Sequence, residues 1–149
     1  MPAPERDPEQ RLSLLLLLVA ANQRMVQLVE RELAADGVDA TDYGALSLIG
    51  VRGEIRLTEL AGELGMPLTT MSDVVRRLEG RGHVRRRPNP DDGRSFLFEL
   101  TARGDREWRR GWGALQRVNE QLAHDVDFDE MRAALTSLGA AFERALTEV

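Results

Sequence analysis

Arginine is the residue type in this sequence that is best suited to binding chemistry. All twenty basic residues of the 149-residue chain are arginines, and seven of them lie from Arg76 to Arg94, against three acids. The guanidinium group is permanently charged and donates paired hydrogen bonds, which suits phosphates and the edges of bases. The chain as a whole has a net charge of -5, so this basic stretch lies between acidic flanks. The uneven distribution predicts one surface that meets a polyanion.

The residue types that most enzymatic and metal chemistry needs are scarce. The chain has no cysteine, which excludes disulfides, thiolate metal sites and a thiol nucleophile. Its two histidines, His83 and His124, lie 41 positions apart, and no acidic cluster has the spacing of a calcium loop. No nucleophile, base and orienting group come together along the sequence. We therefore expect no catalytic residue, no metal site and no cofactor.

Two short helices with a tight turn between them place polar groups on one surface. Thr58 is expected to cap a helix that Gly65 ends, and Pro67 is expected to begin the next helix, which runs to Gly80. The second helix has an apolar stripe, formed by Met71, Val74, Val75 and Leu78. Its outward positions are then Thr69, Ser72, Asp73 and Arg76. This arrangement is typical of a helix-turn-helix.

A β-hairpin is expected directly after this pair of helices. Its strands are residues 83–87 and 94–100, joined by a polar turn over residues 88–93. Phe96, Phe98 and Leu100 alternate along the second strand, so they should lie on one side of it. The first strand carries Arg85, Arg86 and Arg87, which either contact the polyanion or only keep the strand soluble.

The chain begins with an apolar helix that we expect from Pro8 to about Ala35. Leu14, Leu18, Ala21, Met25 and Leu28 form its stripe, and three further leucines at 15–17 widen it, which implies burial on more than one side. A partner chain could supply the second side. A signal peptide or membrane anchor is the alternative. Acids before the leucines and an apolar run about half the ~20 residues of a membrane span argue against it.

Three further helices follow from capping residues. Thr41 is expected to cap a helix that carries Tyr43, and Thr101 and Asp127 to cap the last two. The helix after Thr101 has Trp108, Trp112, Leu115, Val118 and Leu122 on one face. The last helix has Met131, Leu135, Leu138, Phe142 and Ala145 near heptad spacing. The two tryptophans belong either to a core or dimer interface, or to a ligand site.

Four motifs in this order resemble the MarR family of bacterial regulators. They are a Leu-Thr-Glu-Leu-Ala helix start, a Leu-Glu-x-x-Gly helix exit, an Asp-x-Arg wing and a Leu-Thr-x-x-Gly helix start, over residues 57–65, 78–82, 92–94 and 100–104. The resemblance implies a mainly α fold with a small β-wing. A winged helix-turn-helix DNA-binding domain would be joined to a helical dimerisation domain from both termini. The expected regions are 1–36 and 105–149 for dimerisation and 37–104 for DNA binding.

The resemblance also implies which residues contact DNA. The recognition helix maps onto residues 68–81, where short hydroxyls and arginines suit base edges and phosphates in the major groove. In the wing, Asp92 would orient the tip and Arg94 would enter the minor groove. The expected DNA-binding residues are Thr69, Thr70, Ser72, Asp73, Arg76, Arg77, Arg86, Asp92 and Arg94.

The function that the resemblance implies is a cytoplasmic, homodimeric regulator of transcription that binds double-stranded DNA. We expect a repressor that a small apolar or aromatic ligand releases from a palindromic operator, with no membrane partner. The ligand is expected near Met25, Tyr43, Trp108 and Trp112. The alternatives are a winged-helix protein-interaction module without ligand control and, with less support from the residues, an enzyme.

Overall fold

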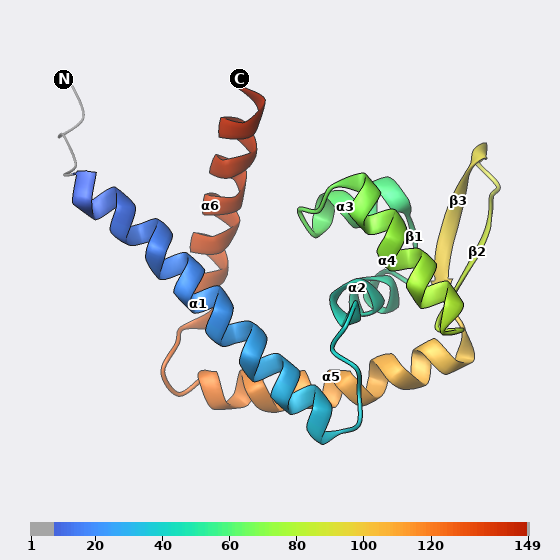
Figure 1. Ribbon diagram of the computed structural model, residues 1–149, viewed down its shortest axis with the longest axis horizontal. Coiled ribbons are helices and arrows are strands. Elements are labelled where there is room, and N and C mark those ends of the chain that lie inside the picture. The colour runs from blue at the N-terminus through green and yellow to red at the C-terminus, as the bar shows by residue number, and fades with distance from the viewer. Residues whose placement is uncertain (1–7, 149) are drawn as a thin grey trace. The chain divides into compact units, whose positions relative to one another are not determined.

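The computed structural model describes residues 8–148, with side chains from Ser13 onward, so the first seven residues of the expected 1–36 region lie outside it. The described chain is mainly α, with a small antiparallel sheet (Figure 1). Its elements, in order, are α1 (Pro8–Ala35), α2 (Tyr43–Arg52), β1 (Glu54–Arg56), α3 (Leu57–Glu63), α4 (Leu68–Gly80), β2 (Val84–Asn89), β3 (Asp92–Leu100), α5 (Ala102–Leu122) and α6 (Phe128–Thr147).

The centre of the fold is a winged helix-turn-helix. The sheet has the strand order β1-β3-β2, and both pairings are antiparallel. Ile55 of β1 lies opposite Phe98 of β3, and both side chains are buried. Helices α2, α3 and α4 pack together beside this sheet. Among the residues whose side chains the structure describes, the largest fully buried ones are Leu33, Leu46, Ile49, Leu60, Met71 and Leu78. The expected helix-turn-helix and wing are therefore both present.

The starts of α2 and α3 differ from the expected ones. The residue before α2 is Asp42, not Thr41, and it has a left-handed backbone with φ 64°. The Thr41 amide instead donates to Asp39 Oδ1 at 2.8 Å. Helix α3 begins at Leu57, so Thr58 lies inside its first turn and does not cap it. Arg56 is the residue before α3, and its amide donates to Glu59 Oε2 at 3.2 Å, as in a capping box.

The expected turn and hairpin also differ in detail from the structure. Gly65 has φ 63°, which confirms its left-handed stop after α3. Pro67 is the residue before α4 rather than its first residue. The polar turn expected over residues 88–93 was too long, because Asn89 and Asp92 still pair across the two strands. Only Pro90 and Asp91 remain at the tip, so the described wing is longer than predicted.

Both expected caps of the last two helices are confirmed. The Thr101 hydroxyl accepts a hydrogen bond from the Gly104 amide at 3.0 Å, and α5 begins at Ala102. The Asp127 carboxylate accepts from the amides of Asp129 and Glu130 at 3.0 and 3.1 Å, and α6 follows directly. In each case the side chain satisfies donors that the first helical turn leaves free.

The protein divides into two compact units, one ending at Leu115 and the other beginning at Gln116. The three functional regions expected from the sequence stay a prediction. Within the first unit, α1 exposes apolar side chains, including Leu14, Leu15, Leu16 and Leu17. Within the second, α6 exposes Met131, Leu135, Phe142 and Leu146. Folding of the single chain leaves both apolar surfaces open.

Helix α1 also has the length and composition of a membrane span. The stretch Ser13–Ala35 passes that test, with a mean hydropathy of 1.2 and none of the apolar window buried. The expectation that the apolar run is only about half as long as a membrane span was therefore wrong. A signal sequence near the N-terminus and the mostly buried core helix of a soluble protein pass the same test, so this property does not by itself place the chain in a membrane.

Candidate nucleic-acid interface

Helix α4 separates a buried face from an open one. The stripe predicted from helical spacing, Met71, Val74, Val75 and Leu78, is buried in the core of the winged helix. The opposite face carries the side chains expected to read DNA. Thr69, Thr70, Asp73, Arg76 and Arg77 are exposed, and Ser72 is half-buried. The core packing holds the helix in place while leaving these polar groups accessible.

Two charged residues on this open face are paired with each other. The Arg76 Nη1 donates to Asp73 Oδ1 at 2.7 Å, one helical turn away. Both side chains are mostly exposed, at 72% and 59%. The acid and the arginine that sequence reasoning named separately are therefore one ion pair.

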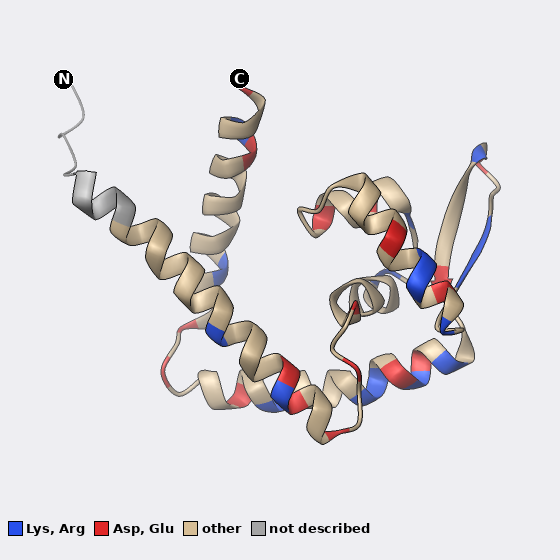
Figure 2. Ribbon diagram, viewed as in Figure 1, with Lys and Arg blue, Asp and Glu red and all other residues tan. Residues whose placement is uncertain are grey.

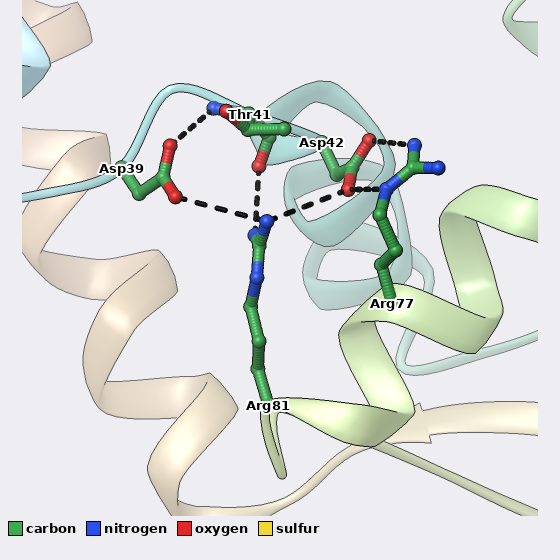
Figure 3. A network of polar contacts seen from close by, with 5 residues as sticks. All are labelled: Asp39, Thr41, Asp42, Arg77 and Arg81. Carbon is green, nitrogen blue, oxygen red and sulfur yellow. Dashed lines mark hydrogen bonds and ion pairs between the residues drawn. The ribbon is translucent and has the colours of Figure 1, made fainter.

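Arg77 points to a different part of the protein. Its Nε and Nη2 donate to the two carboxylate oxygens of Asp42, each at 2.7 Å (Figure 3). This bidentate interaction raises the pKa of Arg77 above its ordinary value. The Asp42 side chain is only 6% exposed, so the carboxylate is largely removed from water. Arg77 was expected to contact DNA, and the structure gives its guanidinium a protein partner as well.

Arg81 reinforces the same junction just after the end of α4. Its Nη1 donates to the Thr41 carbonyl at 3.2 Å, and its Nη2 lies 3.7 Å from Asp39 and 3.9 Å from Asp42 (Figure 3). The hydrogen bonds that Asp39 accepts from Thr41 lower the pKa of Asp39, with Arg81 adding a smaller effect. The segment between α1 and α2 is thus bound to the C-terminal end of α4. Sequence reasoning missed Asp39, Asp42 and Arg81, because no local pattern joins residues about 35 to 40 positions apart.

The tip of the wing is ordered by short polar interactions. Asp92 Oδ1 accepts from the Arg94 amide at 3.1 Å, which fits the expected orienting role of the acid. Asn89, which is buried, accepts from the Asp91 amide at 3.0 Å and donates to the Ser95 hydroxyl at 3.1 Å. Sequence reasoning missed Asn89, although an Asn followed by Pro-Asp signals such a turn. These hydrogen bonds fix the backbone around Arg94.

Arg94 itself is exposed at the start of β3. Among the residues whose side chains the structure describes, its guanidinium has no acidic partner. The three arginines of β2 differ in this respect, because each has an acidic partner: Arg85 lies 2.8 Å from Glu99, Arg86 lies 3.6 Å from Glu79, and Arg87 contacts Glu54. Figure 2 shows basic residues on the second half of α4, along β2 and at the hairpin tip. Arg94 is thus the wing arginine with its charge left available.

Arg86 lies on the other side of β2, facing α4. It lies 3.6 Å from Glu79 of α4, and its guanidinium stacks over the ring of Phe96, 5.0 Å from the centroid. A cavity of about 700 Å³ lies between the wing and α4 beside these groups. Its lining includes Ser72, Arg76, Arg86, Asp92 and Phe96. Predicted DNA-binding residues from the helix and from the wing therefore line one hollow.

The residues expected near a ligand are partly brought together. The Tyr43 hydroxyl donates to the Trp108 carbonyl at 2.6 Å, and burial raises the pKa of Tyr43 to about 12. The rings of Trp108 and Trp112 are 6.1 Å apart, and the indole N–H of Trp108 is buried without an acceptor among the described residues. Met25 lies exposed on α1, apart from this packing.

Glycines make this aromatic packing tight. A side chain at Gly111 would meet the Tyr43 ring, and one at Gly50 would meet the Trp108 ring, each at 2.4 Å. The cavities of about 700 and 430 Å³ are lined by other residues, and the cavity of about 410 Å³ is lined by Gly50 but by none of these aromatic rings. The aromatic rings therefore fill much of the space at this place themselves.

The histidines are not grouped for chemistry. Burial lowers the pKa of His83, whose backbone carbonyl lies against Gly104. His124 is exposed after the end of α5. Among the described residues, no three His, Asp or Glu side chains are grouped to hold a metal ion.

The sequence profile of the MarR family matches residues 38–96. The chain is 32% identical over 88 residues to the multiple antibiotic resistance protein MarR of Salmonella typhimurium. That match covers 59% of this chain and 61% of the Salmonella protein, so the chain spans about three fifths of the length of the curated relatives it matches.

Solved structures resemble almost the whole chain. A cysteine-to-serine mutant of MarR from E. coli, complexed with operator DNA, is similar at a TM-score of 0.74 and 25% identity, covering 91% of this chain and 99% of that one. A probable transcriptional regulator from Pseudomonas aeruginosa is similar at a TM-score of 0.68 and 29% identity, covering 85% and 94%. The likeness extends to the helices outside the profile match.

Proposed function

We propose that this chain is a transcriptional regulator of the MarR family that binds double-stranded DNA sequence-specifically. The observation that carries the proposal is the joint surface of α4 and the wing. It presents the exposed polar face of α4 together with the guanidinium of Arg94, which has no acidic partner among the described residues. Arginine runs are often only solvated, but a charge held at an ordered hairpin tip without a protein partner favours a role in binding.

In the proposed complex, α4 lies in the major groove. Thr69, Thr70, Ser72, Asp73 and Arg76 meet base edges and phosphates there. The wing lies along the backbone, where Arg94 enters the minor groove and Arg86 is close enough to α4 to contact the same duplex. For Arg77 we propose that its pairing with Asp42 fixes α4 and leaves its remaining N–H groups for a phosphate.

We further propose that the regulator acts in the cytoplasm as a homodimer. The exposed leucines of α1 and the exposed apolar residues of α6 support this, because folding of the single chain leaves them open to water. Two copies would present two α4 helices to successive major grooves, about 34 Å apart, and so recognise a palindromic operator.

We also propose that the protein is a repressor and that a small aromatic ligand releases it from DNA. The packing of Tyr43 against the tryptophans of α5 supports it, because the buried Trp108 N–H lacks an acceptor that a ligand oxygen could provide. Such a ligand releases DNA only if it binds better to a conformer whose α4 helices no longer match the operator. Met25, on α1, would have to approach this site in that conformer.

The DNA-binding proposal is tested with duplexes selected from a random library by the wild-type protein. Arg94→Ala should weaken binding to the selected duplex by roughly 10-fold or more, because each subunit gives up a charge in the groove. The dependence of affinity on salt should also decrease, by about 1 in slope for each phosphate that the variant no longer neutralises. Fluorescence anisotropy at several salt concentrations measures both effects.

The matched control is Arg24→Ala, which removes an exposed arginine of α1 that also has no acidic partner among the described residues. It should leave affinity and salt slope unchanged. Equal binding by a folded Arg94→Ala protein and the wild type would refute the proposed role of the wing. A wild-type protein that enriches no sequence would overturn the proposal and favour a protein-interaction module.

A further inference from the structure

The ion pair between Asp73 and Arg76 has no evident role in holding the fold together. Its partners lie at i and i+3 on the open face of α4 and remain 59% and 72% exposed. Exposed pairs of this kind contribute little to stability, because water already solvates both charges. The buried face of α4, not this pair, fixes the helix. The reason for the pair therefore has to be sought in what the open face binds.

An acid at this place is costly for a surface that meets DNA. Asp73 follows the short hydroxyl residues Thr69, Thr70 and Ser72 and is the acid on this open face of α4, with Arg76 as its paired cation. Its carboxylate repels phosphates, and attraction to phosphates supplies nearly all non-specific binding to DNA. Asp73 thus lowers affinity for any duplex unless a particular base compensates for it.

The geometry of the pair leaves both partners able to bind a base. Only Nη1 of Arg76 is used by Asp73, so the Nε and Nη2 N–H groups stay free, and Arg76 lines the hollow between α4 and the wing. Asp73 uses Oδ1, which leaves Oδ2 free to accept. In the major groove a G·C pair presents the acceptors N7 and O6 beside the N4–H donor of cytosine. The free N–H groups of Arg76 match the two guanine acceptors, and the free Oδ2 of Asp73 matches the cytosine donor.

We propose that Asp73 and Arg76 act as one coupled reader that selects a G·C base pair in each half-site. The inference rests on the proposed function, since it requires α4 to lie in the major groove. Arg76 donates to guanine, and Asp73 accepts from the paired cytosine while holding the guanidinium in place. The same carboxylate rejects DNA that lacks this base pair, so the pair contributes to specificity more than to affinity.

Removing each partner should have opposite effects on non-specific binding. Asp73→Ala frees Arg76 to contact phosphates, so affinity for a mixed-sequence duplex should rise about threefold or more. The preference for the G·C duplex over the same duplex with A·T at that position should fall by roughly 10-fold. Arg76→Ala leaves the carboxylate uncompensated, so it should weaken binding to both duplexes. The double variant should bind mixed-sequence DNA better than Arg76→Ala alone.

The experiment uses the 149-residue chain and duplexes chosen by random-library selection, with anisotropy titrations at one salt concentration. Three probes are compared: the selected duplex, its A·T-substituted form and a mixed-sequence duplex. Asp105→Ala is the matched control, because it removes an equally negative residue from an exposed pair, with Arg109 at 2.8 Å, on α5. Asp73→Asn, which keeps the size of the side chain and an acceptor, should fall between wild type and Asp73→Ala.

The outcomes separate this inference from the function on which it rests. The coupled reader requires that the wild type prefers a G·C pair and that Arg76→Ala loses this preference. If either result is not obtained, the coupled reader is refuted. The same holds if Asp73→Ala binds mixed-sequence DNA no better than Asp105→Ala does. In both cases the proposed function as a DNA-binding regulator still stands if the wild type selects a sequence. A wild type without any sequence preference overturns the function and the inference together.

Discussion

The side chain of Asp42 links two helices that are far apart in the sequence. Asp42 has a left-handed backbone, which costs a non-glycine residue about 1 kcal/mol, although Asp is among the residues that tolerate it best. That backbone places a nearly buried carboxylate against the guanidinium of Arg77. Two charge-assisted hydrogen bonds offset the removal of the acid from water. One side chain thus joins the start of α2 to α4.

We expect Asp42→Ala to lower the free energy of unfolding by about 2 to 3 kcal/mol. The substitution leaves Arg77 without its partner and puts alanine at a backbone angle that it adopts reluctantly. Asp42→Asn should be less destabilising, because Asn tolerates the same angle and keeps one acceptor. Urea unfolding at a fixed protein concentration measures both differences.

Asp39→Ala provides the comparison for this prediction. Asp39 also faces Arg81 but is 60% exposed, so its removal should cost clearly less than that of Asp42. Equal unfolding midpoints for Asp42→Ala and Asp39→Ala would contradict the view that the buried carboxylate stabilises the junction.

At the scale of elements, features that depend on neighbouring residues were predicted from the sequence, whereas contacts between residues far apart in the sequence were not. The stripe Met71, Val74, Val75 and Leu78 was predicted correctly, because helical spacing alone decides which side of α4 is apolar. The caps Thr101 and Asp127 were predicted for the same local reason. The pairing of Asp42 with Arg77 was not predictable, since it depends on how α2 and α4 pack. The DNA-binding roles stay predictions, because they depend on a partner outside the chain.

Ligand binding is expected where α2 packs against α5 and Tyr43 meets Trp108. A phenolic or planar aromatic compound that binds there should quench tryptophan emission and reduce affinity for the selected duplex. Linkage requires the duplex to weaken binding of the compound by the same factor. Fluorescence titrations of a compound panel, with and without the duplex, measure this coupling.

Trp112→Phe keeps Trp108 as the remaining tryptophan reporter for these titrations, because the chain has two tryptophans. Compounds that quench emission but leave duplex affinity unchanged would be bound without regulating. If no compound in the panel has both effects, control by the abundance of the protein becomes the better account.

For the whole molecule, the main feature is the exposed apolar surface of helices α1 and α6. Leu16 and Leu17 of α1 are 61% and 63% exposed, and Phe142 of α6 is 45% exposed. Large apolar surfaces of this kind mark interaction sites in soluble proteins. A homodimer would cover them and at the same time provide the twofold symmetry that a palindromic operator requires.

We expect the 149-residue chain to sediment as a dimer at micromolar concentration. Leu16→Gln combined with Leu17→Gln should produce monomers, because both substitutions remove apolar area that a partner would bury. The same change should leave the fold of the single chain intact, since these leucines already contact water there. A wild type that sediments as a well-folded monomer would contradict the prediction, and so would a double variant that stays dimeric.

The division of α4 into a buried and an open face has a consequence for how such proteins diverge. Substitutions at exposed helix positions usually change stability by less than about 0.5 kcal/mol, whereas changes in the core cost several times more. Thr69, Asp73 and Arg76 are therefore free to vary without threatening the fold. After gene duplication, one copy could acquire a new operator through a few mutations while its inherited scaffold stays unchanged.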